Sequence, residues 1–288
     1  MPLLKLDNMI SIMIDGMVNA RVAGLAVYLD NWAIYDLAEK EPTRRDRFTR
    51  AIRMGADLLF SAANLAELGG PTGRSADLVR AFLDDIGPHW FPIELDTIAV
   101  VKRELKGVDK ERVCVSRDLL MDIVNVHVHQ RSSSRIINFS PDEFFRLGAV
   151  LDWAGPQRDS LCRGSANMDV ALRNRIALHA RRWKKEPRSL DKELPPMPFE
   201  HDRPASFAFC HLLHGLVKSG HSPRKHDGLD FSHAVMGSAF AHFAALDTKW
   251  KERIEELSKP NGLASVYCPS ELDKLVDDLE TAVLRKAS

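Results

Sequence analysis

Acidic residues placed at or soon after the ends of short apolar runs are the residues of this chain best suited to chemistry. Four of them lie far apart in the sequence: Asp30, Glu67, Asp230 and Asp247. Asp30 follows the apolar run 25–29, and Asp247 follows the run 243–246. If such runs are parallel strands, their carboxyl ends share one edge of a sheet, where open α/β sheets bind ligands. Clustered carboxylates repel one another unless a cation is present, and Mg²⁺ and Mn²⁺ prefer oxygen ligands. The pattern therefore predicts a divalent-metal site.

A structural role competes with this interpretation for Asp30, Asp230 and Asp247. Asp30 and Asp247 are suited to cap the helices that follow them. Asp227 is suited to cap the helix that carries Asp230, with Asp230 at the third position as its partner. An aspartate in a first helical turn also complements the helix dipole. Glu67 does not fit a capping role, because it falls near the end of its expected helix, where negative charge is disfavoured. This residue therefore favours the metal-site interpretation.

Four polar residues accompany the acids and are expected to support them: Asn31, Asn64, Asp227 and His233. Asn64 shares a helix face with Glu67, and His233 shares one with Asp230, because three residues make about one turn. For His233, a role in orienting Asp230 or contacting a phosphate competes with an ordinary buried contact.

The elements that must position these residues alternate between strands and helices at both ends of the chain. Apolar runs predict strands at 25–29, 58–60, 242–246 and 263–267, whereas 90–93 is ambiguous. Helices are expected at 1–20 in part, 31–40, 43–54, 62–68, 75–86, 97–106, from 140 onward, 163–185, 206–218, 229–241, 248–258 and 270–286. This alternation predicts an α/β fold with a central, mainly parallel, twisted sheet. We expect the core to comprise 1–96 and 206–288, with 97–205 as a helical insertion.

The composition is that of an ordinary globular protein. Of the 288 residues, 45% are hydrophobic, and 40 basic residues balance 40 acidic ones, so total charge does not indicate a strongly basic nucleic-acid binder. The four cysteines form no CxxC pair, which is typical of free thiols in a reducing compartment. We expect no signal peptide and no membrane partner, because no run approaches the roughly 18 apolar residues of a membrane span. The expected location is the cytoplasm.

One stretch is locally basic despite the neutral total. Residues 158–188 hold nine Lys or Arg residues and three acids, a net charge of +6. A phosphate backbone is the natural partner of such a helix, and a solvated face paired with acids elsewhere is the alternative. The residues expected to contact nucleic acid are Arg173, Arg175, Arg181, Arg182, Lys184 and Lys185.

The order and spacing of the acids resemble those of the PIN (PilT N-terminus) domain nucleases. The segments that carry the resemblance are 27–31, 61–68, 229–234 and 246–247. As in that family, an aspartate ends the first strand and a glutamate lies in the helix after the second. An aspartate then opens a later small-residue helix, and another follows the next strand. The resemblance covers about 25–95 and 206–268 and not the middle. One departure is Ala245, which stands where many family members carry threonine or serine.

The resemblance implies a three-layer α/β/α sandwich with an extra helical region. It also implies a metal-dependent endoribonuclease in which the four acids hold Mg²⁺ or Mn²⁺. RNA would be the substrate, and hydrolysis would leave a 5′-phosphate and a 3′-hydroxyl. A toxin or defence-type nuclease is one option, with an inhibitor or antitoxin protein and a homodimer as implied assemblies, although the chain is about twice the usual length of a PIN toxin. A nuclease acting on DNA or structured RNA, and a non-catalytic scaffold that binds RNA or protein, remain alternatives.

Overall fold

A five-stranded parallel sheet forms the centre of the molecule. The computed structural model describes every residue except 1–8, 13–17, 23, 122–145, 188–191, 193–196, 221, 258–261 and 288. The strands are β3 (Leu25–Leu29), β4 (Ala56–Ser61), β5 (Trp90–Ile93), β6 (Phe243–Ala245) and β7 (Ser265–Tyr267), in the order β5-β4-β3-β6-β7. All four neighbouring pairs are parallel. The predicted α/β fold with a parallel sheet is therefore confirmed. The ambiguous segment 90–93 is an edge strand, where Pro92 is tolerated.

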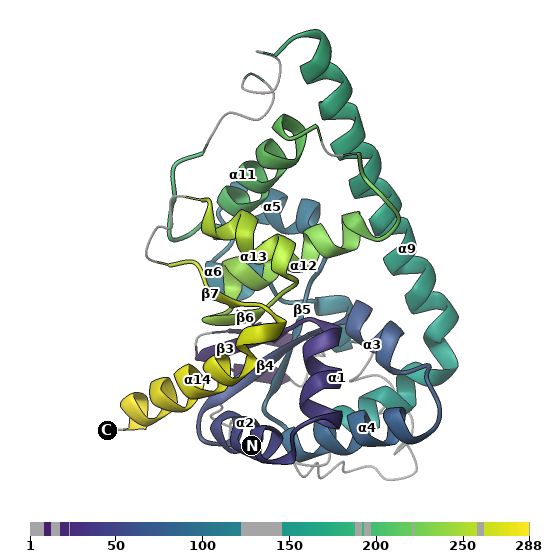
Figure 1. Cartoon of the computed structure of the whole chain (residues 1–288), viewed down its shortest axis with the longest axis vertical. Helices are drawn as coiled ribbons and strands as arrows, with labels where there is room; N and C mark the ends of the chain where they lie inside the picture. The colour runs from purple at the N-terminus through teal and green to yellow at the C-terminus, as the bar shows by residue number, and fades with distance from the viewer. Residues whose placement is uncertain are drawn as a thin grey trace.

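Helical layers cover both faces of the sheet (Figure 1). In β3, Val27 and Leu29 join one buried core cluster, while Ala26 and Tyr28 join the other, so the strand is buried on both sides. This explains why it is a continuous apolar run. The first cluster packs against α1 (Asn31–Glu39), α2 (Pro42–Arg53), α4 (Arg74–Ile86) and α14 (Leu272–Ala287), the last preceded by the 3₁₀ turn η1 (Pro269–Glu271). The second packs against α5 (Thr97–Leu105), α11 (Pro204–Lys218), α12 (Asp227–Phe240) and α13 (Thr248–Glu255).

The strand order reverses direction at one place in the sheet. From β3 the chain proceeds through β4 to β5 at one edge, and β6 and β7 are then added on the other side of β3. The reversal makes β3 and β6 neighbours, with Tyr28 opposite Ala244 and Leu29 opposite Ala245. A ligand crevice is expected outside the carboxyl ends of the strands at such a point.

The helix after β4 begins with a well-formed cap. In α3 (Ala62–Leu68), the Asn64 backbone N–H donates to Ser61 Oγ at 3.2 Å, and the Ser61 backbone N–H donates to Asn64 Oδ1 at 3.0 Å. This reciprocal pair is a capping box with asparagine at its third position. Ser61 therefore caps α3, and the cap fixes the start of the helix that carries Glu67.

A single long helix, α9 (Leu147–Lys185), contains the predicted basic helix 163–185 as its C-terminal part. Figure 1 shows it running along one side of the molecule, from α4 past α3 to the level of α11. It continues through Pro156 because Leu147, Val150 and Leu151 are buried in the core, and this packing outweighs the lost backbone hydrogen bond. Neither α9 nor any other helix in the described part of the chain is long and apolar enough to cross a membrane.

The middle of the chain supplies α5, the short α6 (Lys110–Val113) and α9. Val100, Leu172 and Ile176 from this region join the same core cluster as Tyr28 of the central strand. These helices therefore complete the core beside the sheet, and the division into 1–96 with 206–288 and a 97–205 insertion stays a prediction. The helix start expected at 140 lies outside the described residues.

The leading helix expected within 1–20 is wrong. The described residues there form β1 (Met9–Ile12) and β2 (Val18–Arg21), which pair antiparallel with Met9 opposite Arg21. Isoleucine and valine alternate with polar residues in these segments, a period of two that favours strands.

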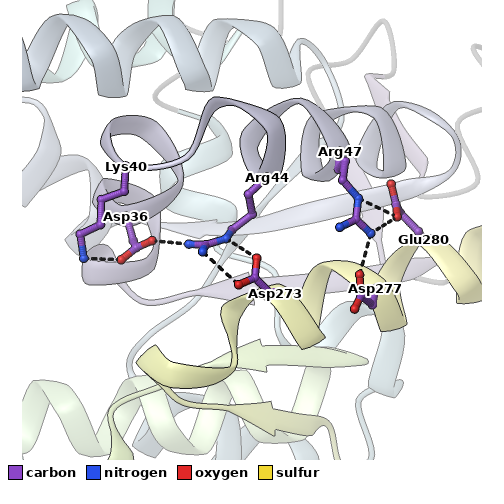
Figure 2. Close-up of polar contacts among 7 residues, drawn as sticks. All are labelled: Asp36, Lys40, Arg44, Arg47, Asp273, Asp277 and Glu280. Carbon is purple, nitrogen blue, oxygen red and sulfur yellow. Dashed lines mark hydrogen bonds and ion pairs between the residues drawn. The ribbon is translucent and has the colours of Figure 1, made fainter.

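An ion-pair network joins α2 to α14 and α1 (Figure 2). Arg44 contacts Asp273 at 2.6 Å and Asp36 at 2.7 Å. One turn further along α2, Arg47 contacts Asp277 at 2.6 Å and also Glu280. The acids of α14 that face α2 are thus matched by arginine side chains.

Candidate functional site

Two of the predicted acids lie at the carboxyl ends of the neighbouring strands β3 and β6. Asp30 is the N-cap residue of α1, and its Oδ1 accepts the Asn31 backbone N–H at 2.7 Å. Asp247 occupies the N-cap position of α13, but its side chain accepts no capping hydrogen bond. The capping alternative therefore holds for Asp30 and not for Asp247. Since β3 and β6 flank the strand-order reversal, both side chains lie at the crevice expected there.

Glu67 is held by a chain of buried amide and hydroxyl groups. Ser61 Oγ donates to Asn64 Oδ1 at 2.7 Å, and Asn64 Nδ2 donates to Asn31 Oδ1 at 2.7 Å. The Asn31 amide in turn donates to Glu67 Oε2. Ser61, Asn64 and Asn31 are at most 7% exposed, whereas Glu67 is exposed. The relay orients a solvent-facing carboxylate from beneath, so two of the predicted supporting residues are placed beside Glu67.

Asp230 lies in the first turn of α12 and pairs with a lysine that the sequence analysis did not single out. Lys249 Nζ donates to Asp230 Oδ2 at 2.9 Å and lies 3.4 Å from Asp227 Oδ1. The prediction that Asp227 caps this helix is wrong, because the N-cap residue is His226, in a left-handed conformation with φ of 75°. Asp227 Oδ2 instead accepts the Arg224 backbone N–H at 2.6 Å. The first turn of α12 thus places both aspartates next to Lys249.

The start of α12 is fixed by Asp169 of α9, a residue that was not among the predicted site residues. Its Oδ1 accepts the backbone N–H of Gly228 at 2.9 Å and of Leu229 at 3.3 Å. The packing is close: a Cβ on Gly228 would lie 2.4 Å from the Asp169 carbonyl oxygen. Arg173, one turn along α9, donates to Asp169 Oδ2 at 2.8 Å. Arg173 was predicted to contact nucleic acid, and the structure engages it in this internal ion pair.

His233 lies beneath the acids and pairs with a tyrosine. The Tyr28 hydroxyl and His233 Nδ1 share a hydrogen bond, and both side chains are buried. Burial raises the pKa of Tyr28 well above its ordinary value, and the charges of Asp30 and Glu67 add to the rise. Burial lowers the pKa of His233. The pair is therefore neutral and forms a buried polar contact beneath the acids. The hydrogen bond that His233 makes is to Tyr28, not to Asp230.

The acids share one electrostatic environment. Burial raises the pKa of Asp30 to about 7; the Asn31 N–H opposes the rise, and the charges of Asp247 and Asp230 add to it. Burial also raises the pKa of Asp247, again reinforced by Asp230. The charge of Glu67 acts on Tyr28 together with that of Asp30, which connects the fourth acid to the same site. The charges of carboxylates from four separate segments thus act on a shared set of groups at the carboxyl edge of the sheet.

The donor set is made of oxygen atoms, which suits a hard divalent cation. Across the described residues, no group of three or more His, Cys, Asp or Glu side chains is arranged in metal-binding geometry. Two of the acids already have side-chain partners: Asp230 accepts a hydrogen bond from Lys249, and Glu67 accepts one from Asn31. The carboxylates therefore influence one another's pKa values, but within the described residues they are not arranged as a set of metal ligands.

The basic end of α9 lies away from the acids. Among the residues predicted to bind nucleic acid, the exposed ones are Arg175, Arg181, Arg182, Lys184 and Lys185. At 1.5 Å per residue, Arg181 to Lys185 lie roughly 18–24 Å along the helix from Asp169, where α9 meets α12. A nucleic acid that touched both regions would have to run along α9.

Comparisons of this chain with protein-family models, with curated proteins and with solved structures found no match.

Proposed function

We propose that this chain is a metal-dependent endoribonuclease with a PIN-like arrangement of its acids. The observation that supports this most strongly is the convergence of Asp30, Glu67, Asp230 and Asp247 at the carboxyl edge of the sheet, around the strand-order reversal. Among the described residues, the ion pairs made with these acids come from Lys249. One lysine cannot balance four carboxylates, so the site has an excess of negative charge that a divalent cation would neutralise.

The same four acids would hold Mg²⁺ or Mn²⁺. Their oxygen-only chemistry fits these ions, and the raised pKa of Asp30, about 7, reflects a burial and a repulsion that a cation would relieve. When bound, such an ion lowers the pKa of a water molecule and offsets charge on the phosphate. The relay from Ser61 through Asn31 would keep Glu67 oriented, and Asp169 would keep the first turn of α12 in place.

The reaction would be hydrolysis of an RNA phosphodiester bond. A water oxygen would add to phosphorus while the bond from phosphorus to the 3′ oxygen breaks. The departing 3′ oxygen would take up a proton and the water would lose one to solvent, leaving a 5′-phosphate and a 3′-hydroxyl. The exposed basic end of α9 would bind the backbone of the same strand several nucleotides away.

Single replacements of the acids test this proposal. Asp30→Asn and Asp230→Asn should each lower Mn²⁺-dependent cleavage of a labelled single-stranded RNA by about 100-fold or more. Asp273→Asn on α14 is the matched control, because its carboxylate pairs with Arg44 and is not among the charges that act on Asp30 or Asp247. Cleavage by both variants at the wild-type rate would show that the site is wrongly assigned. Cleavage of a matched DNA or duplex RNA in place of the single strand would favour those substrates instead.

A further inference from the structure

A cavity of about 530 Å³ opens at the carboxyl edge of the sheet and has no role in the hydrolysis described above. It lies between the start of α3, the carboxyl end of β5, the start of α5 and the middle of α9. Ala62 and Ala63, which line it, belong to the helix that carries Glu67. Its volume is within the range of small-ligand sites, roughly 300–1,000 Å³. The cavity therefore shares the functional edge of the sheet and can accept part of a bound substrate.

The walls of the cavity are apolar and its edge is polar. Leu95, Ile98, Leu161 and Met168 supply apolar surface from both sides, and Gly164 leaves space between the α9 side chains. Such walls suit a flat ring, which packs against aliphatic side chains on both faces.

Ser116 adds a small polar side chain to the edge. It lines the cavity and is only 6% exposed. Its backbone N–H donates to the Pro92 carbonyl at 3.1 Å, which fixes the position of the residue. A serine hydroxyl can donate or accept a hydrogen bond, so it can pair with a polar edge of a ligand.

Two carboxylates also line the edge. Glu94 Oε1 accepts the Leu95 N–H at 2.9 Å and the Asp96 N–H at 3.0 Å, which holds the Glu94 side chain in place. Asp96 Oδ1 caps α5 by accepting the Ala99 N–H at 3.0 Å. Ionised carboxylates only accept hydrogen bonds, and they repel phosphate. A ligand group that enters here must donate hydrogen bonds and cannot be an anion. Arg103 already lies 3.7 Å from Glu94 Oε2, which reduces the negative charge of this edge and the need for a cationic ligand.

We propose that this cavity binds one nucleobase of the RNA substrate and prefers bases with an exocyclic amino group over uracil. The inference rests on the proposed nuclease function, because the cavity then holds a base of the strand that the acids cleave. A flat base fills the apolar walls, its amino group donates to Glu94 or Asp96, and its ring acceptors face the Ser116 hydroxyl. Uracil lacks the exocyclic amino group and therefore donates no such hydrogen bond to Glu94 or Asp96.

A glycine replacement isolates the cavity from the acids. A Cβ on Gly164 would meet no atom within 4 Å, so Gly164→Leu extends a side chain into open space without displacing the helix backbone. Leucine also favours helix more than glycine does, so α9 should remain folded. Gly215→Leu is the matched control, because Gly215 is exposed on α11 and its Cβ would likewise meet nothing within 4 Å.

The test is binding of adenosine, cytidine and uridine to the whole chain in EDTA, measured by saturation-transfer NMR and calorimetry. Wild type and Gly215→Leu should bind adenosine and cytidine, with uridine about tenfold weaker because one hydrogen bond is missing. Gly164→Leu should lose adenosine and cytidine binding. Equal binding by Gly164→Leu and wild type, absence of adenosine and cytidine binding at millimolar concentration, or equal binding of uridine would overturn the inference. Since the assay contains no metal and scores no cleavage, these failures are distinct from loss of the nuclease proposal.

Discussion

The molecule has two groups of acids that differ in how far their negative charge is balanced by basic side chains. On α14, Asp273, Asp277 and Glu280 face arginines of α2, and charge is balanced pair by pair (Figure 2). At the carboxyl edge of the sheet, Lys249 pairs with Asp230, whereas Glu67 and Asp30 accept hydrogen bonds from neutral groups of Asn31. The first group joins two helices, which is a structural task. The second retains uncompensated charge at a ligand-binding edge, which costs stability and is typical of functional sites.

The largest expected contrast is in catalysis. Glu67→Gln keeps the shape of the side chain and an oxygen for the Asn31 amide, but removes the charge. We expect Mn²⁺-dependent RNA cleavage to fall by about 100-fold or more, because a charge aimed at the reacting group is lost. Glu280→Gln, which loses its charge beside Arg47, should cleave as wild type does. Rates on one labelled RNA measure both, and a large loss in Glu280→Gln would remove the distinction between the two groups.

The next contrast is in stability without metal. The pKa of Asp30 is about 7 in the folded protein, above the ordinary value of 3.8. Between about pH 7 and about pH 4 the folded state therefore binds a proton at Asp30 more readily than the unfolded state does. The free energy of unfolding in EDTA should therefore rise as pH falls from about 7 toward 4. Asp30→Asn should raise the stability at pH 7.5 by on the order of 2 kcal/mol and weaken this pH dependence.

Urea unfolding at several pH values measures this effect. Asparagine is also a good helix cap, so the start of α1 should be preserved in the variant. Asp273→Asn is the control and should not increase stability. If Asp30→Asn is less stable than wild type at pH 7.5, the acids at the sheet edge are not the unfavourable cluster that we describe.

A smaller effect is expected from Lys249, the cation of the acidic site. Burial alone would lower the pKa of Lys249, but its hydrogen bond to Asp230 and the charges of both aspartates outweigh burial and raise it. Lys249→Gln frees Asp230 and makes the site more negative. Mn²⁺ should then bind about fivefold more tightly, a gain of about 1 kcal/mol. Calorimetric titration tests this, and weaker Mn²⁺ binding would mean that Lys249 supports the ion and does not compete with it.

The smallest effect belongs to the paired acids. Arg44 is 16% exposed and contacts Asp273, which is 70% exposed, so solvent screens the pair. A double-mutant cycle with Arg44→Ala and Asp273→Ala should give a coupling energy of about 0.5–1 kcal/mol. Thermal or urea unfolding of the four proteins supplies it. A coupling well above this range would mean that the α2–α14 network is a major source of stability.

Residues whose role depends on local pattern could be predicted from the sequence. The run 25–29 indicated a buried strand because both of its faces are covered, and Asp30 marked its end. Ser61 and Asn64 follow one another at the spacing of a cap, which depends only on neighbouring residues. The position of Glu67 late in its helix was likewise a local property, and it was the best indication that the acids are more than caps.

Residues whose role depends on distant packing could not be predicted. Lys249 is one of many surface lysines by sequence, and its pairing with Asp230 arises only when α12 and α13 pack together. Asp169 looked like an acid within a basic helix, although it caps α12. The pairing of β1 with β2, and the continuation of α9 through Pro156, depend on contacts that no local periodicity records.

Calorimetric titration of the whole chain with Mn²⁺ tests the central claim most directly. The account predicts that wild type binds Mn²⁺ with a dissociation constant below about 1 mM, as a multi-carboxylate site should. A protein carrying both Asp30→Asn and Asp230→Asn should show no such binding, while Asp273→Asn should match wild type. Absence of Mn²⁺ binding by wild type at millimolar concentration, or unchanged binding by the double variant, would contradict the assignment of the sheet edge as a metal-dependent site.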